Sequence, residues 1–525
     1  MAFQQRLLKS FALLFSTKSG RVLKKTEQKR WQHTSPLAAI FYLGKIYKAI
    51  AQNAVQSLAP LAALLFASKG DLVGRIVFGV VVFMTSTIIV AFVRYWFFRY
   101  RIGDDSILIR EGVLKKTQLD IRFSRIQAIN TQQNIVFRLF DLVTVQFDTA
   151  GSAKQEGHLP AIRSAFADSL KERIRDKRPA SAADSDDQTE SEIESRSLLK
   201  LGIKDMVRIG LSSNRALVFL VLLGPVLDNM ENRIEAAIDD SAMLAALDGA
   251  GLSIASGIGL VLSVSILFIL VLAIASIIGA FLRYHRFELR AENNVLRSIG
   301  GLLTRHEHSV NIGKIQSLRA IQNPVLRLFR RFRLRAKQAS SGRRSKGKLF
   351  IIPICEPAQL RSLGSEVFGD EFAGVDLQPK SPSFWPIANN FVRSRFILFG
   401  LLPSLLAVLL YFFLLGTAAL FFLIWIPVSA FATWVYYRKY GFAIGANGMV
   451  LRKGFIGYQT TAFLFRKVQR ISVTQTPRQK RKGLATIRFF LASGSLRLPY
   501  VDNQMAKDLR DYILYKVETS RRAWH

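Results

Sequence analysis

The sequence predicts an integral membrane protein of α-helical hairpins, each followed by a small all-β domain, in a threefold internal repeat. Three observations indicate this class. Long apolar runs carry almost no charge, one pattern of glycine, basic and glutamine residues recurs three times, and basic residues follow each pair of apolar runs. Half of the 525 residues are apolar, which is compatible with a membrane protein.

Six transmembrane helices are expected, in three hairpins. Residues 396–437 contain no charged side chain, and the run is long enough for two spans of about 20 residues each. Gly416 and Thr417 mark a turn between these two spans. The other two pairs are expected at 49–68 with 72–98 and at 216–227 with 251–282, where the first member of each pair has the weaker signal.

The distribution of charge orients the spans. The formal net charge is +36, and Lys and Arg near span ends are retained on the cytoplasmic side. The tip of the second hairpin, 228–250, holds one basic residue, Arg233, among acidic ones. The segments after the second, fourth and sixth spans instead begin with Arg94 and Arg99, Arg283 and Arg286, and Arg438 and Lys439. We therefore expect a multi-pass protein of the cytoplasmic (inner) membrane, with the β domains and the basic N-terminus in the cytoplasm.

The repeat follows from constant spacing. Adding 189 to a position in the first copy, and then 153, aligns three invariant columns without gaps. These columns are Gly112, Gly301 and Gly454; Gln127, Gln316 and Gln469; and Gln133, Gln322 and Gln475. A basic residue precedes the first glutamine column by two positions in every copy, as Arg125, Lys314 and Lys467.

Each copy is expected to form strands and a closing helix. Pairs such as Ile121 and Phe123 alternate with polar neighbours, as in half-buried strands. The shared glycines mark hairpin turns in which φ can be positive. A strand ending near a proline precedes a helix, with Ile162, Phe166, Leu170 and Ile174 on one helical face in the first copy, and Met505, Leu509 and Ile513 after an N-cap at Asp502 or Asn503 in the third.

The expected domain boundaries follow from these segments. They are a basic N-terminus at 1–35, hairpins at 36–98, 198–283 and 395–437, β domains at 99–178, 284–368 and 438–520, a disordered acidic linker at 179–197 and an extended linker at 369–394.

The chain resembles the YdbT-like bacterial pleckstrin-homology membrane proteins. The resemblance rests on Arg125-Ile126-Gln127 with Gln133 and Arg138, on Lys314-Ile315-Gln316 with Gln322 and Arg327, and on Lys467-Val468-Gln469 with Gln475. The third copy departs from the pattern at Pro477 and Lys480. The resemblance implies a pleckstrin-homology-like β-sandwich or barrel with a C-terminal helix, and a smaller one-domain homologous membrane protein as a partner.

No enzyme chemistry is expected. The sequence shows no phosphate loop, nucleophile turn or dinucleotide fingerprint. The single cysteine, Cys355, excludes an internal disulfide, and His306 and His308 have no third metal ligand near them in sequence. We therefore expect no catalytic residue, cofactor or metal.

The strongest candidate for a binding surface is a basic stretch in the second copy. Its candidate anionic-lipid or partner surface consists of Arg327, Arg330, Arg331, Arg333, Arg335, Lys337, Arg343 and Arg344. On a strand, the residues from Arg331 to Lys337 alternate between cations on one face and apolar residues on the other. Each cation near an anionic leaflet contributes about 1 kcal/mol. Alternatively, these cations are solvated and follow only from the topology, and nucleic acid is the less favoured ligand because stacking aromatics are few.

The repeat columns have two interpretations. Gln127, Gln316 and Gln469 could bind a partner peptide, but a buried glutamine that satisfies strand backbone explains them better, and turn conformation explains the glycines. The leading function is a noncatalytic membrane scaffold whose three domains bind lipid headgroups, a protein partner or each other, including as a homo-oligomer. The alternatives are transport or export, and defence against membrane-active peptides.

Overall fold

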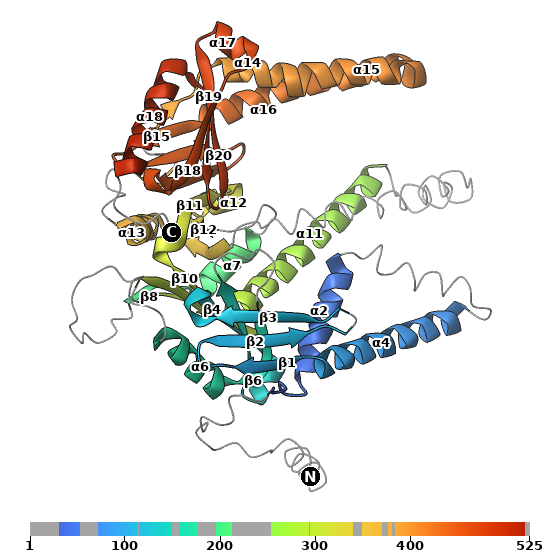
Figure 1. Ribbon diagram of the computed structural model, residues 1–525. Helices are drawn as coiled ribbons and strands as arrows, with labels where there is room; N and C mark the ends of the chain where they lie inside the picture. Colours follow the sequence, from blue (N-terminus) through green and yellow to red (C-terminus); the bar gives the residue numbers. More distant parts are fainter. Residues whose placement is uncertain are drawn as a thin grey trace, which may run out of the picture. The chain divides into compact units, whose positions relative to one another are not determined.

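A computed structural model describes residues 31–52, 72–113, 115–149, 157–176, 196–212, 254–292, 294–339, 349–369, 376–380 and 384–519. The chain divides into two compact units. Figure 1 labels their helices and strands. The first comprises Met1–Ile126, Val136–Thr149 and Gln155–Asp186, and the second comprises Gln127–Ile135, Ala150–Lys154 and Asp187–His525.

The first unit contains two helices followed by the first β domain. Its elements in order are α2 (Ala38–Gln52), α4 (Leu72–Trp96), β1 (Arg99–Ile102), β2 (Ser106–Glu111), β3 (Thr117–Arg122), the short helix α5 (Ile135–Leu139), β5 (Leu142–Thr149), β6 (His158–Arg163) and α6 (Ser164–Asp176). Strands β1, β2 and β3 form an antiparallel sheet in that order, and β5 pairs with β6. Ile107, Phe123, Phe147 and Leu159 of this domain are fully buried.

The second unit begins with a strand from the first copy. Strand β4 (Ile126–Asn134) lies almost wholly in this unit and pairs antiparallel with β10. The second copy continues the sheet in the order β10, β9, β8 and β7. The elements of this region are β7 (Arg196–Lys200), α7 (Ile203–Leu211), α11 (Ile254–Tyr284), β8 (Glu288–Glu292), β9 (Val295–Gly300) and β10 (Thr304–Asn311).

A seven-stranded antiparallel sheet joins the second copy to the third. Its order is β13-β12-β11-β17-β16-β15-β14, so strands from two copies lie in one sheet. The second copy supplies β11 (Ile315–Gln322), α12 (Pro324–Leu328), β12 (Phe332–Gln338), β13 (Leu349–Cys355) and α13 (Pro357–Phe368). The third copy supplies β14 (Trp385–Pro386), β15 (Gly441–Ile444), β16 (Gly448–Lys453) and β17 (Tyr458–Leu464).

The third copy ends in a separate three-stranded sheet, β18 (Val468–Thr474), β19 (Leu484–Leu491) and β20 (Gly494–Asp502), with α17 (Pro477–Arg481) and the closing helix α18 (Asn503–Thr519). Asp502 caps α18 as expected, because its Oδ1 accepts from the backbone N–H of Gln504 at 2.9 Å and of Met505 at 3.1 Å. Leu509 and Ile513 are buried against the β strands.

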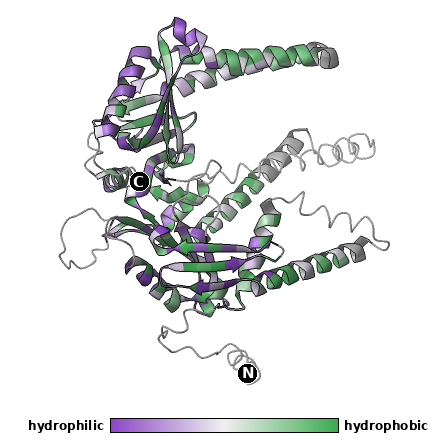
Figure 2. Cartoon of the chain, in the orientation of Figure 1, coloured by the Kyte–Doolittle hydropathy of each residue, from purple (hydrophilic) through white to green (hydrophobic). Residues whose placement is uncertain are grey.

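Among the residues that the structure describes, four helical segments are long and apolar enough to cross a membrane. They are Val77–Trp96, Ile266–Tyr284, Asn390–Phe412 and Ala419–Lys439. Between 6% and 17% of the residues in each are buried among the described residues, and Figure 2 colours these helices largely green, for hydrophobic. Such exposed apolar helices match a lipid environment. The expected span at 49–68 lies outside the described residues beyond Gln52, and the one at 216–227 lies wholly outside them.

The last hairpin has the turn predicted from the sequence but begins earlier. It consists of α14 (Asn390–Phe396), a π-helical turn (Ile397–Leu401), α15 (Leu402–Leu415), a 3₁₀ segment (Gly416–Ile424) and α16 (Trp425–Lys439). Gly416 has φ +54°, which ends the first helix. A Cβ on Gly400 would lie 2.2 Å from Ser429 Oγ, so glycine allows the two helices to approach closely.

Three local expectations were wrong. Ile162 belongs to β6 and not to the following helix, which starts at Ser164. Strand β7 begins at Arg196, inside the expected disordered linker, and β14 lies inside the expected linker 369–394. Both strands are short and gain their hydrogen bonds from β8 and β15, so their own sequence carries little strand signal.

The glycine column occupies hairpin turns in all three copies. Gly112 and Gly301 have φ of +107° and +115°, values that only glycine adopts without strain. Gly454 has a φ outside that range, but a Cβ there would lie 2.1 Å from the Gly457 carbonyl oxygen. Each column member therefore has a structural reason to be glycine.

Candidate anion-binding site

Strand β12 carries the core of the predicted basic surface. Phe332, Leu334 and Ala336 are buried, and Arg333, Arg335 and Lys337 lie half-buried on the opposite face. This alternation was predicted from the sequence. It places three cations on one face of the seven-stranded sheet.

The sheet adds two cations that are distant in sequence. Arg319 on β11 lies directly opposite Arg335, and β11 in turn pairs with β17. Lys453, at the end of β16, is close enough to Arg319 and Lys337 for each to influence its ionisation. The cation cluster therefore comprises Arg319, Arg333, Arg335, Lys337 and Lys453.

Burial and mutual repulsion act on this cluster together. Burial lowers the pKa of Arg319 below its ordinary value, and Arg335 lowers it further. Burial likewise lowers the pKa of Lys453, with added contributions from Arg319 and Lys337. Like charges in a partly desolvated place disfavour one another, so an anion among them would be stabilised.

A cavity of about 210 Å³ opens beside this cluster. Arg319, Lys453 and Gln459 line it from the seven-stranded sheet, and Arg395 and Arg497 line it from α14 and β20. Its volume is below the roughly 300–1,000 Å³ of drug-sized ligand sites, so it suits a small group such as a phosphate.

Two donors in the cavity wall have no acceptor among the described residues. The Nε of Arg319 and the Nε2 of Gln459 are shielded from solvent and make no hydrogen bond there. A buried donor without an acceptor costs about 1–3 kcal/mol. A phosphate oxygen would satisfy both kinds of donor, and guanidinium is well shaped for it.

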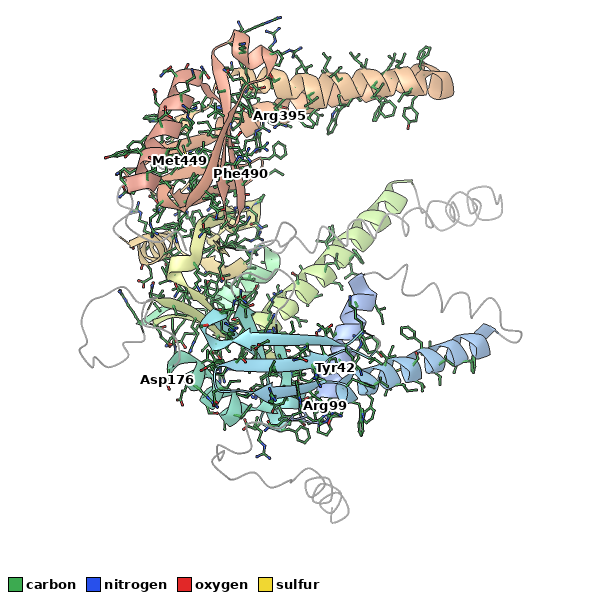
Figure 3. The ribbon with its side chains drawn as sticks, in the orientation of Figure 1. Tyr42, Arg99, Asp176, Arg395, Met449 and Phe490 are labelled. Carbon is green, nitrogen blue, oxygen red and sulfur yellow. The ribbon has the colours of Figure 1, made fainter. Side chains whose placement is uncertain are left out.

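The cavity lies at the ends of the last membrane hairpin. Phe391 and Arg395 lie in the first turns of the span Asn390–Phe412, and Tyr436 lies in the last turn of Ala419–Lys439. Figure 3 labels Arg395 where this hairpin meets the β strands. Its guanidinium carbon lies 5.4 and 5.2 Å from the ring centroids of Phe391 and Phe399, which hold it near the helix base.

The other members of the predicted surface are placed elsewhere. Arg331 pairs with Glu356 at 2.6 Å, and Arg327 lies over the ring of Tyr458 at 5.5 Å. Arg330 has φ +51° just after α12. Arg343 and Arg344 lie outside the described residues. The structure therefore brings only Arg333, Arg335 and Lys337 of the predicted set into the cluster.

Sequence reasoning missed Arg319, Arg395, Lys453, Gln459 and Arg497. They come from five elements of the second and third copies, β11, α14, β16, β17 and β20. Only the register of β11 with β12 and β17 brings Arg319 to the cluster. The repeat gives one weak signal: the positions equivalent to Arg319 are Asn130 and Ser472, so the cation is specific to the second copy.

Two glutamines of the second column, Gln322 and Gln475, hydrogen-bond to backbone and so have a structural role. Gln322 Nε2 donates to the Arg331 carbonyl at 3.3 Å, and Gln475 Nε2 donates to the Leu484 carbonyl at 2.8 Å. These two acceptors are equivalent positions in the repeat, 153 apart. Gln133 also has a polar contact.

The first glutamine column is not uniform. Gln316 is buried, but its Nε2 has no hydrogen-bond partner among the described residues, whereas Gln469 is exposed on β18. The interpretation as a buried glutamine that satisfies strand backbone is therefore wrong for Gln469, because β18 lies at a sheet edge. The side chain of Gln127 lies outside the described set.

The spans and the repeated β domains together define a membrane protein with PH-like domains. The family model described as "Bacterial PH domain" matches residues 40–178, 243–366 and 397–517, more than half of the chain, so the chain belongs to this family.

The chain is similar to the UPF0699 transmembrane protein YdbT of Bacillus subtilis (strain 168). The two are 22% identical over 417 residues, which cover 76% of this chain and 80% of that protein. No solved structure matches the chain.

Proposed function

We propose that this protein is a noncatalytic scaffold of the cytoplasmic membrane, with its PH-like domains in the cytoplasm, and that the cavity at the base of the last hairpin binds the phosphate of an anionic lipid. The observation that carries the proposal is a pair of solvent-shielded donors, on Arg319 and Gln459, that find no acceptor within the part of the chain that the structure describes, in a cavity with three further cations. The positive-inside bias supports the orientation.

The position of the cavity favours a lipid over a soluble phosphate. Two of its walls, α14 and α16, belong to the predicted spans Asn390–Phe412 and Ala419–Lys439. A headgroup in the adjoining leaflet reaches this depth while its acyl chains remain in the membrane. Since the spans hold the site at the membrane surface, modest affinity is sufficient for occupancy.

The test compares lipid binding by two double variants in mild detergent. Arg319→Gln with Lys453→Gln removes two cavity cations, and Lys480→Gln with Arg488→Gln removes two exposed cations of the third copy. Native mass spectrometry then measures retention of phosphatidylglycerol and of phosphatidylcholine, and sodium phosphate serves as the soluble competitor.

We expect the cavity variant to bind phosphatidylglycerol at least about tenfold more weakly, because each hydrogen bond to a charged group contributes about 1.5–3 kcal/mol. The variant with Lys480→Gln and Arg488→Gln should bind phosphatidylglycerol like the wild type. Retention of phosphatidylcholine should be the same in the wild type and both variants. Equal loss in both variants would reduce the effect to net charge and refute the cavity as the site. Full displacement by sodium phosphate would point to a soluble anion.

A further inference from the structure

The two junctions between copies share one geometry. In the second unit, β4 pairs with β10 through Thr304↔Asn134, Arg305↔Gln133, His306↔Gln132 and Glu307↔Thr131. Strand β11 pairs with β17 through Gln322↔Tyr458, Ile321↔Gln459, Ala320↔Thr460, Arg319↔Thr461 and Leu318↔Ala462. In the repeat, Gln133 corresponds to Gln322 (189 further on) and Arg305 corresponds to Tyr458 (153 further on), and these two residues are also paired. The next two pairs of each junction correspond in the same way. The register of the two junctions is therefore the same.

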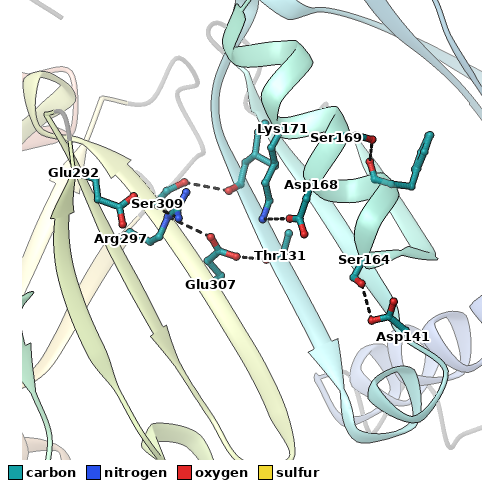
Figure 4. A network of polar contacts seen from close by, with 12 residues as sticks. Thr131, Asp141, Ser164, Asp168, Ser169, Lys171, Glu292, Arg297, Glu307 and Ser309 are labelled. Carbon is teal, nitrogen blue, oxygen red and sulfur yellow. Dashed lines mark hydrogen bonds and ion pairs between the residues drawn. The ribbon is translucent and has the colours of Figure 1, made fainter. Parts of the chain in front are cut away.

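Side chains support the first junction across the strand pair. Thr131 Oγ1 donates to Glu307 Oε2 at 2.7 Å, and Arg297 holds the other carboxylate oxygen at 3.3 Å, as Figure 4 shows. Asn130 Oδ1 accepts from the backbone N–H of Ser309 at 3.0 Å. These contacts fix the register by polar complementarity.

The second junction is fixed by close approach. A Cβ on Gly457 would lie 2.1 Å from the Gln322 carbonyl oxygen, so only glycine fits against β11 there. Ala462 and Leu464 of β17 are buried in the core of the second copy, and Lys467 donates to the carbonyl of Gly313. Each junction is thus a built interface between neighbouring copies.

Two equivalent edges remain without a partner strand in the described parts of the chain. Strand β3 pairs there only with β2, and β18 pairs only with β19. By the repeat spacing, β3 corresponds to β10 and β17, and β18 corresponds to β4 and β11. The first copy therefore has the edge that accepts a preceding copy, and the third copy has the edge that accepts a following one.

We propose that β18 of one molecule pairs antiparallel with β3 of a second copy of this chain, which repeats the internal junction between molecules. The register follows from the spacing: Thr474 lies opposite Thr117, Val473 opposite Gln118, and Ser472 opposite Leu119. Such a head-to-tail contact uses two different surfaces, so it propagates into a row or closes into a ring. The pairing is a strand addition, in which backbone hydrogen bonds supply the contact.

The membrane spans favour this assembly. Strand β1 begins at Arg99, shortly after α4 ends at Trp96, and β15 begins at Gly441, two residues after α16 ends at Lys439. Both domains that carry an open edge are therefore tied to spans in the same membrane, which confines the copies and raises their local concentration. Unpaired edges are the places where strand addition occurs.

The test is a disulfide cross-link between two differently tagged chains. One chain carries Thr117→Cys and the other Thr474→Cys; both positions are exposed, and the native Cys355 is buried. Opposite residues in an antiparallel pair have Cα atoms about 4.5–5.5 Å apart, within the range of a disulfide. The matched control pairs Thr117→Cys with Arg470→Cys, an exposed position about 13 Å along the same strand.

We expect mild oxidation of membranes containing both chains to give the mixed dimer at least about tenfold faster for Thr117 with Thr474 than for the control. Equal rates, or no mixed dimer, would overturn the proposal. A disulfide that forms only when both cysteines are in one chain would also overturn it, because the edges would then meet within one molecule. Cross-linking only to a different, smaller protein would assign the edge to that partner and refute the second copy.

Edge pairing and lipid binding involve different residues of the chain. The Arg319→Gln and Lys453→Gln changes lie away from both open edges in sequence and in strand order. If lipid binding fails and the mixed dimer forms, only the cavity assignment is lost. If lipid binding holds and the mixed dimer does not form, only the edge pairing is lost.

Discussion

Replacement of Gly457 by alanine tests the sharing of a sheet between copies. The new Cβ would lie 2.1 Å from the Gln322 carbonyl oxygen and 3.0 Å from the Asn323 Cα. Both obstacles are backbone atoms, so side-chain rotation cannot relieve the clash. The strands must separate by about 1 Å, which takes a backbone hydrogen bond of about 2.9 Å beyond its favourable range.

The expected cost combines the steric strain with the weakening of backbone hydrogen bonds. Overpacking of this kind typically costs 1–3 kcal/mol, and one or two weakened hydrogen bonds contribute about 1 kcal/mol each. We therefore expect the local opening free energy of the β11 and β17 pair to fall by about 2 kcal/mol. Since 1.4 kcal/mol is a factor of ten, amide exchange there should be about 30-fold faster.

Hydrogen exchange with mass spectrometry measures this on the purified protein in detergent, in peptides that cover Leu318 to Gln322 and Tyr458 to Ala462. The control is Gly202→Ala, because a Cβ at Gly202 meets nothing within 4 Å and its φ is −89°. It should leave exchange in β11 and β17 within about 0.5 kcal/mol of the wild type. If Gly457→Ala also stays in that range, the two strands are not paired as described.

Three further predictions concern single side chains. Burial, and then His308 and Arg283, lower the pKa of His306, so the unfolded chain binds the proton more readily and the stability of the fold should fall as the pH drops below 6.5 toward that lowered value. His306→Gln should therefore reduce the loss in thermal midpoint between pH 7.5 and pH 5.5. An unchanged loss would exclude this histidine as the cause. Burial raises the pKa of Cys355 to about 12, so maleimide should label it at neutral pH only after denaturation; rapid labelling of the native protein would contradict its burial. Arg331→Ala breaks the 2.6 Å ion pair with Glu356, whose carboxylate is 49% exposed, so the free energy of unfolding should fall by only about 0.5 kcal/mol in denaturant unfolding. A fall above about 2 kcal/mol would show that the pair stabilises the fold more than its exposure implies.

The sequence alone determined the local features of this protein. Residues 396–437 predicted the last hairpin and its turn at Gly416, because hydrophobic run length and glycine conformation are properties of a single segment. The period of two in β12 predicted the separation of Arg333, Arg335 and Lys337 from the buried Phe332, Leu334 and Ala336. The constant spacing predicted three copies of one domain.

Only the tertiary structure decided which strands pair beyond their own copy. The repeat pattern specifies strands β4 and β11 equally well whether their outer edges face solvent or the next copy, because a strand's alternation reports the faces of a sheet and carries no information about its edges. The pairing of β11 with β17 is what brings Arg319 beside Lys453 and Gln459. The candidate site could therefore not be assembled from the basic stretch of the second copy, since the cations that complete it come from segments far apart in the chain and meet only through backbone hydrogen bonds between copies.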